Sequence, residues 1–396
     1  MKKAIIGSSL FLFLFTLFSC LILNTPSSVL YLLNWGEYID SSLVKGLEKK
    51  FNCQVIEETV TSSEAMYQKI AGGTTSYDVA IPGDYVVSRL YEEDLLNELD
   101  VSDKDSYPNL FSYQTIFHPA LKALMDEYMV DKEGKSIASY FMPYFWGTYS
   151  LIYSTRKEGV EEAVKENGFA ALYDNSLTPP GTKKGMYNTA RWIVASYLLS
   201  KGLDPNIVDA SLSKEGDLSA ELQNEIIAAI KNASFHELGD DKLKRDVANG
   251  ELDMCFTQLG DYFDGLYFLY DSGLDPSSYK VCVPKVTAAF FDSMVIPSTC
   301  QNSSLANAFI DYMLDPENAY ANAKSIGYSP ALLSVDALLE ERAESEEFYP
   351  NLSQRDFLDI YPNYLNPLAG VSKSYLLEPK PNEYLTTCET ILNNLS

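Results

Sequence analysis

Three side chains near the start of the chain suit the binding of an apolar cation. They belong to the stretch VLYLLNWGEY, residues 29–38, in which Trp35 offers a ring face, Glu37 a carboxylate and Tyr38 a hydroxyl. All three follow an apolar run, residues 29–33, that predicts a buried strand, and ligands of open α/β sheets bind beyond the carboxyl ends of strands. The alternative is an ordinary strand-to-helix connection with a core tryptophan and a solvated glutamate.

A second candidate turn, IPGDY at residues 81–85, is expected at the same edge of the sheet. The pattern before it alternates strands and helices, which predicts a parallel sheet. The strands are expected at residues 29–33, 54–59 and 77–81, and the candidate helix N-caps are Asp40, Ser41, Ser62 and Ser63. Because Asp84 and Tyr85 follow the third strand, they join the candidate site.

A chain of 396 residues is longer than a single hydrophobic core usually supports, so we expect two domains. Two apolar runs are long enough to pass from one domain to the other, residues 149–153 and residues 290–296. The expected division is a signal, anchor and tether at residues 1–28, lobe 1 at residues 29–148 plus 297–396, and lobe 2 at residues 149–296. Residues 330–396 read as helical and acidic.

The first residues form a targeting segment, with Lys2 and Lys3 before an apolar run. LFSC at residues 17–20 resembles a bacterial lipobox, in which a peptidase cuts before a cysteine that carries lipid. That pattern predicts lipidation of Cys20 and a body on the outer face of the membrane. An uncleaved N-terminal anchor is the alternative, with the same location.

Charge and composition argue against several classes of function. A formal charge of -25 repels phosphate backbones, so we expect no nucleic-acid partner. With only two histidines and no CxxC pair, the chain has little from which to build a transition-metal site, and we expect neither a metal nor another cofactor. The cysteines imply no disulfide framework.

Five short motifs in a fixed order resemble the spermidine/putrescine-binding family, the extracellular solute-binding components of polyamine ABC importers. They are NWGEY at 34–38, IPGDY at 81–85, PYFWGT at 143–148, FDSMVIP at 291–297 and IGYSP at 326–330. The resemblance implies a two-lobed α/β fold, the type II periplasmic-binding-protein-like fold, with hinge strands that cross between the lobes. It also implies a cleft that closes on its ligand.

The resemblance assigns roles to residues. Glu37 would take one terminal ammonium, beside Trp35 and Tyr38, and Asp292 would meet the other amine. The remaining residues that match the ligand-binding positions are rings and polar groups: Asp84, Tyr85, Thr189, Trp192, Gln258, Phe290 and Tyr328. A polyamine suits these groups, because its methylenes pack on aromatic faces and its ammonium ions pair with carboxylates.

Two departures from the family leave the ligand open. Thr189 and Trp192 stand where the family usually has two carboxylates, and Asp261 is a candidate to compensate. Either Phe256 or Gln258 fills the place of a family tryptophan. A pocket with fewer anions would favour putrescine over spermidine, or would bind another organic cation or a small zwitterion.

The leading interpretation is a binding protein without catalysis, a monomer that delivers a polyamine to the membrane subunits of an ABC permease. A hydrolase is the contrasting class, because two carboxylates such as Glu37 and Asp292 can flank a glycosidic bond as acid and base. The motifs around these two residues match no hydrolase pattern, and a membrane tether suits an importer.

Overall fold

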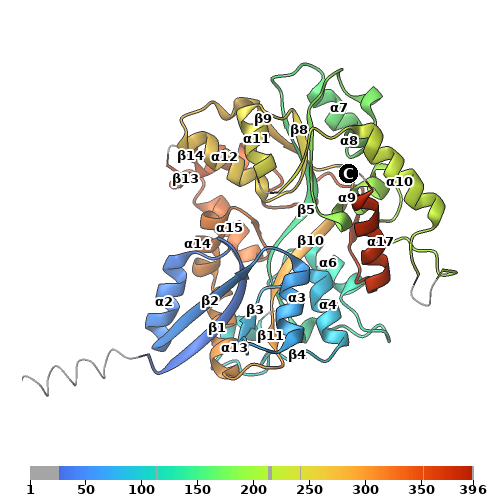
Figure 1. Cartoon of the computed structure of the whole chain (residues 1–396). Coiled ribbons are helices and arrows are strands. Elements are labelled where there is room, and N and C mark those ends of the chain that lie inside the picture. Colours follow the sequence, from blue (N-terminus) through green and yellow to red (C-terminus); the bar gives the residue numbers. More distant parts are fainter. Residues whose placement is uncertain (1–25, 113–114, 213–215, 241, 351, 395–396) are drawn as a thin grey trace, which may run out of the picture.

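The computed structural model describes residues 26–112, 115–212, 216–240, 242–350 and 352–394. Most of the expected targeting segment, including Cys20, lies outside these residues. Within them, none of the helices combines the length and the apolar composition needed to cross a bilayer. Two lobes lie one above the other, joined by long strands that run between them (Figure 1).

Lobe 1 contains the expected parallel sheet, whose three strands lie in the order β2-β1-β3. Its elements alternate along the chain: β1 (Ser28–Trp35), α2 (Ser41–Phe51), β2 (Cys53–Val60), α3 (Ser63–Gly72), β3 (Val79–Ala80) and α4 (Asp84–Glu92). The register runs from Ser28 opposite Cys53 to Trp35 opposite Val60. Strands β1 and β2 therefore end level with each other.

Local sequence signals fix where the first helices begin and end. Asp40 caps α2 by accepting a hydrogen bond from the backbone N–H of Ser42 (2.6 Å), and Ser62 caps α3 by accepting one from the N–H of Ala65 (3.1 Å). Gly73 ends α3 with a φ of 59°, a left-handed conformation that glycine adopts without steric cost. Both predicted caps are confirmed.

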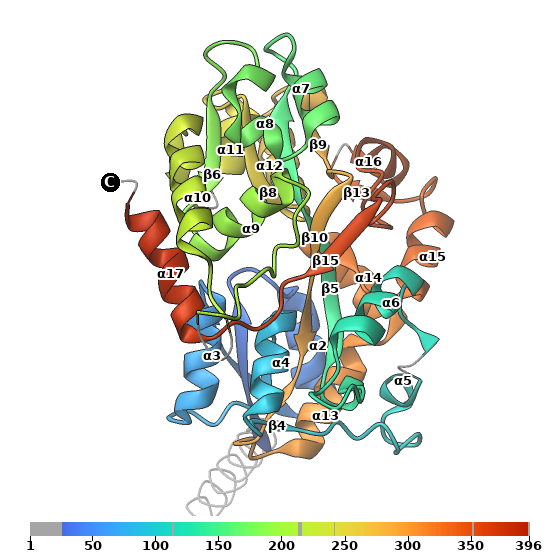
Figure 2. The same cartoon turned by 90° about the vertical axis from the view of Figure 1, so that its right-hand side faces the viewer.

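Two antiparallel strands connect the lobes, β5 (Met142–Ser154) and β10 (Val286–Met294). All 13 residues of β5 are buried. Its first half pairs with β10, and its second half pairs with β8 (Met254–Gln258) and β9 (Tyr279–Cys282). The runs expected to cross between the domains lie in β5 and across the end of β10, which Figure 2 shows running side by side along the molecule.

Lobe 2 is built on a mixed sheet that continues from β5 through β8 to β6 (Lys184–Tyr187) and β7 (Glu237–Gly239). Its helices are α7 (Val160–Asn167), α8 (Ala170–Tyr173), α9 (Ala190–Ser200), α10 (Ala220–Ala233), α11 (Lys242–Asn249) and α12 (Asp261–Asp271). Helix α9 is buried on almost every side, consistent with its nearly continuous apolar sequence.

The connecting and later elements complete lobe 1 and its junction with lobe 2. They are β4 (Leu96–Asn97), α5 (Pro108–Phe111), α6 (Pro119–Tyr128), β11 (Ile296–Pro297), α13 (Ser303–Met313), α14 (Pro316–Ile326), β12 (Ser329–Pro330), α15 (Leu333–Glu341), β13 (Glu347–Tyr349), β14 (Leu352–Ser353), α16 (Gln354–Ile360), β15 (Lys373–Leu376) and α17 (Asn382–Asn393). The expectation of a purely helical C-terminal part is wrong, because three short strands lie within it.

The C-terminal segment reaches across to lobe 2. Strand β15 pairs in parallel with β10, and α17 packs against α9 and α10 (Figure 2). The Asn206 side chain holds this segment in place through two hydrogen bonds. It donates to the carbonyl of Leu376 (2.8 Å) and accepts from the N–H of Glu378 (2.9 Å). We therefore propose a division of the chain in which α17 belongs with residues 149–296 and not with lobe 1.

Candidate binding cleft

A cavity of about 920 Å³ lies between the lobes and brings together most of the predicted site residues. Ten of them line it: Trp35, Glu37, Tyr38, Asp84, Tyr85, Trp192, Gln258, Phe290, Asp292 and Tyr328. Val60, Thr61 and Gly83 line it as well, so the carboxyl ends of the lobe 1 strands face the cavity. Thr189 is not among the lining residues, and its side chain makes no capping hydrogen bond at the start of α9.

The end of β1 is held in a defined conformation at the cavity. The Trp35 Nε1–H donates to the carbonyl of Ile81 (2.8 Å) and so connects this end to the turn that follows β3. Glu37 is exposed and has a φ of 55°, a left-handed conformation that residues other than glycine seldom adopt. Such backbone conformations concentrate at ligand sites, where the surrounding structure fixes them.

Asp292 is a partly buried carboxyl on the hinge strand β10, with its side chain beside Tyr38. The Tyr38 hydroxyl donates to Asp292 Oδ2 (2.7 Å). The register between β10 and β5 shifts between Asp292 and Ser293, and such a bulge re-aims the side chain next to it. Burial raises the pKa of Asp292 to about 7, although the Tyr38 hydrogen bond acts to lower it.

Asp84 brings a second carboxyl, this one buried, to the same wall at the start of α4. Its oxygens accept from the backbone N–H groups of Tyr85 (2.6 Å) and Phe291 (3.1 Å), so it joins α4 to β10. Burial raises the pKa of Asp84 to about 8, and the neighbouring Asp292 charge adds to the shift. A cation at this wall would therefore favour the ionised form of both carboxyls.

Aromatic rings cover the cavity between the two lobes. The Trp192 ring lies 5.4 Å from that of Tyr187 and 5.9 Å from that of Tyr149, measured between centroids. Tyr328 meets Tyr38 edge-on at 5.3 Å. Ring faces of this kind attract cations and also pack against methylene groups.

A glycine makes room for the Phe290 ring at the middle of β5. A Cβ atom at Gly147 would stand 2.8 Å from Cζ of Phe290, closer than any normal contact.

The sequence left open whether Phe256 or Gln258, both on β8, belongs to the site. In the structure Gln258 lines the cavity, whereas Phe256 is fully buried in the core.

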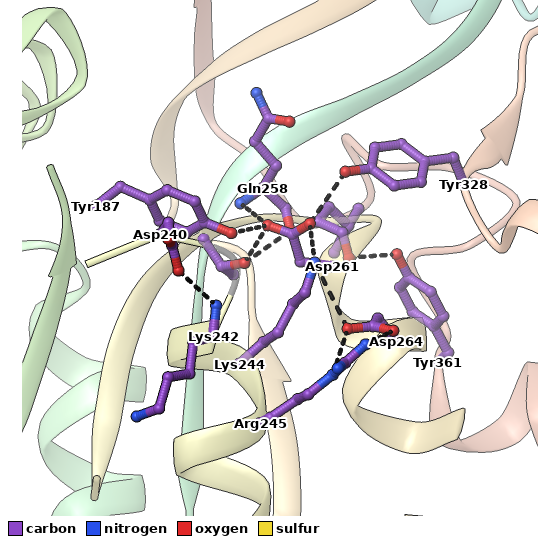
Figure 3. Close-up of polar contacts among 12 residues, drawn as sticks. Tyr187, Asp240, Lys242, Lys244, Arg245, Gln258, Asp261, Asp264, Tyr328 and Tyr361 are labelled. Atoms are coloured by element: carbon purple, nitrogen blue, oxygen red, sulfur yellow. Dashed lines mark hydrogen bonds and ion pairs between the residues drawn. The ribbon is translucent and has the colours of Figure 1, made fainter. Parts of the chain in front are cut away.

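Lobe 2 contributes a polar cluster around Asp261 (Figure 3). Here Lys244 Nζ lies 3.2 Å from Asp261 Oδ1, and Arg245 pairs with Asp264 (3.1 Å). Burial works to raise the pKa of Asp261, but the Lys244 cation and several hydrogen bonds outweigh it and hold the pKa below its usual value.

The sequence reasoning missed three cationic residues that line this side of the cavity, Lys242, Lys244 and Arg245. The available signal was DDKLKRD at residues 240–246, a basic group in a strongly acidic chain. A basic run of this kind usually forms a solvated helix face, so only the fold reveals that it faces the cleft.

The geometry matches a cleft for a ligand that is cationic at the lobe 1 end and apolar along its length. Two carboxyls, one buried and one partly buried, and a hydroxyl lie at that end, and rings lie along the cavity. Its volume falls in the range typical of sites for small molecules.

Comparisons with known proteins agree with this geometry. The family model for bacterial extracellular solute-binding proteins matches residues 42–349. The putrescine-binding periplasmic protein PotF of Escherichia coli (strain K12) is 24% identical over 338 residues, 83% of this chain and 85% of that protein. A spermidine/putrescine-binding periplasmic protein of Salmonella typhimurium is 26% identical over 333 residues, 83% of this chain and 84% of that protein.

Among solved structures, a putative spermidine/putrescine ABC transporter from Listeria monocytogenes matches with a TM-score of 0.68 and 26% identity. The match covers 93% of this chain and 99% of that one. The resemblance inferred from the five motifs and the expected two-lobed type II fold are both confirmed by these likenesses.

Proposed function

Because the chain belongs to the bacterial extracellular solute-binding proteins, we propose that it captures a polyamine, of the putrescine and spermidine class, outside the cytoplasm and delivers it to an ABC importer. One observation carries the choice of ligand. The partly buried carboxyl of Asp292, hydrogen-bonded by Tyr38, faces a ring-lined cavity between two lobes. An ammonium ion is the natural partner for such a carboxyl, since a buried carboxylate is stable only when a cation or hydrogen bonds compensate it.

The wider role follows from the same proposal. We infer that the permease subunits in the membrane receive the ligand, and that the protein works as a monomer without catalysing a reaction. The predicted lipid on Cys20, or an uncleaved N-terminal segment, would keep the protein close to that permease.

Removal of the Asp292 carboxylate tests the proposal. We expect Asp292→Ala to weaken putrescine binding by about 2 kcal/mol or more, because the ligand ammonium then lacks its anionic partner. Calorimetric titration of the purified protein with putrescine and spermidine measures the change.

A matched control removes the same charge far from the cavity. Asp126 lies on α6 with 63% of its side chain exposed, and Asp126→Ala should bind like the wild-type protein. Wild-type affinity in Asp292→Ala would place the ligand elsewhere. An absence of heat with any polyamine would contradict the proposed function.

A further inference from the structure

We propose that Lys244 sets the amine selectivity of the cleft by occupying, at Asp261, the place that the second ammonium of a diamine would need. The inference rests on the proposed amine binding at the lobe 1 end. It concerns the opposite end, where Thr189 and Trp192 leave Asp261 as the candidate acid.

Asp261 has no acceptor capacity to spare. Five donors converge on its two oxygens (Figure 3). Oδ1 accepts from Lys244 Nζ (3.2 Å) and the Tyr328 hydroxyl (3.1 Å), and Oδ2 accepts from the Tyr187 hydroxyl (3.0 Å), Thr257 Oγ1 (2.8 Å) and the Gln258 N–H (3.2 Å). An ionised carboxylate offers about four lone-pair sites, so these donors already fill it.

Lys244 is well placed to compete with a ligand. Its side chain is only 11% exposed and that of Asp261 only 8%, so their pairing is shielded from water. Lys244 also approaches Asp264 (3.6 Å), which Arg245 holds as well. Both acids that α12 contributes to the cavity, Asp261 and Asp264, are therefore already paired with cations of the chain.

A continuous line of contacts joins this cluster to Asp292 at the lobe 1 end of the cavity. Tyr38 donates to Asp292, the rings of Tyr38 and Tyr328 meet edge-on, and Tyr328 donates to Asp261. A ligand whose first ammonium reaches Asp292 thus extends along these rings toward Lys244. A second ammonium there would be repelled by the positive charge of Lys244, whereas an uncharged methyl group would not.

Two ligands of equal length test the inference. Putrescine and 1-aminopentane differ in one terminal group, an ammonium in the first and a methyl in the second. We expect the wild-type protein to bind putrescine no more than about 10-fold more tightly than 1-aminopentane. In Lys244→Met, which removes the fixed positive charge beside Asp261, we expect the preference for putrescine to rise about 10-fold or more.

Two further variants make the comparison specific. Lys244→Arg keeps the cation and should keep the wild-type preference. Lys165→Met removes the same charge from α7 of lobe 2, where Lys165 pairs with Glu161 on the surface, and should also keep it. Calorimetry at one pH and ionic strength gives all the ratios.

The outcomes separate the inference from the function on which it rests. An unchanged or reduced preference for putrescine in Lys244→Met would overturn it. If that variant does not fold, a wild-type preference for putrescine well above 10-fold overturns it on its own. Failure of the wild-type protein to bind 1-aminopentane, putrescine or spermidine would instead overturn the proposed function.

Discussion

Two carboxyls lie at the lobe 1 wall, Asp84 buried and Asp292 partly buried, and their protonation depends on their surroundings. Burial raises the pKa of Asp292 to about 7 and that of Asp84 to about 8, and the Asp292 charge also acts on Asp84. Such shifts are frequent at functional sites, because a group that costs stability is kept for what it binds. An arriving ammonium would favour the ionised form of both groups.

This linkage predicts a pH-dependent gain of stability in Asp292→Asn. The unfolded carboxyl titrates near pH 4, whereas the folded one keeps its proton up to about pH 7, so the free energy of unfolding falls as the pH rises between these values. Asparagine has no charge to bury. We expect the variant to exceed the wild type in unfolding free energy by roughly 1–3 kcal/mol at pH 8, and by little near pH 4.

Urea unfolding at the two pH values measures this difference. The matched control is Asp126→Asn, which makes the same replacement at a mostly exposed carboxyl and should change the unfolding free energy by little at either pH. An equal stability difference at both pH values in Asp292→Asn would contradict the raised pKa.

At the scale of elements, the hinge was predictable because its sequence is unusual. The apolar run at residues 149–153, expected to cross between the domains, lies within the fully buried strand β5. The caps at Asp40 and Ser62 were readable for the same local reason. Strand β15 was not predictable, because its four residues form a strand only by pairing with β10, which is distant in the sequence.

The same limit applies to the site. The aromatic and acidic residues at the ends of β1 and β3 could be identified directly from the sequence. The Lys244 pair depends on how α11 packs beside α12, which periodicity does not specify. Thr189 matched a motif position, yet the fold leaves it outside the residues that line the cavity.

A substitution in strand β5 should affect both packing and ligand binding. Gly147→Ala introduces a Cβ atom where the Phe290 ring lies, so the ring must move within the cavity wall. We expect a loss of about 1–3 kcal/mol in unfolding free energy, together with weaker putrescine binding. Thermal unfolding and calorimetry measure the two effects.

A second substitution shows whether the clash is the cause. Phe290→Leu removes the ring, so Gly147→Ala should cost much less stability in that background than in the wild type. Equal costs in the two backgrounds would mean that the Phe290 ring does not determine the effect.

At the scale of the whole molecule, the cleft lies between two bodies connected by a few segments. Strands β5 and β10 cross as a pair, and β12 joins them by pairing with β5 at Trp146 and Phe145. Near this junction a Cβ atom at Gly260 would collide with the Tyr328 ring, so lobe 2 and the segment after α14 fit closely there. Such narrow connections are typical of hinge closure around a ligand.

This architecture predicts that binding draws the lobes together. A ligand held by Asp292 on one side contacts rings of lobe 2 on the other, so its binding energy favours the conformation in which both walls reach it. Small-angle scattering should therefore show a smaller radius of gyration with saturating putrescine than without it. Asp292→Ala at the same ligand concentration should keep the larger value, because the variant lacks the lobe 1 partner for the ammonium. A wild-type scattering curve that saturating ligand leaves unchanged would mean that this cleft binds without closing, with the ligand fitting the arrangement of lobes already present.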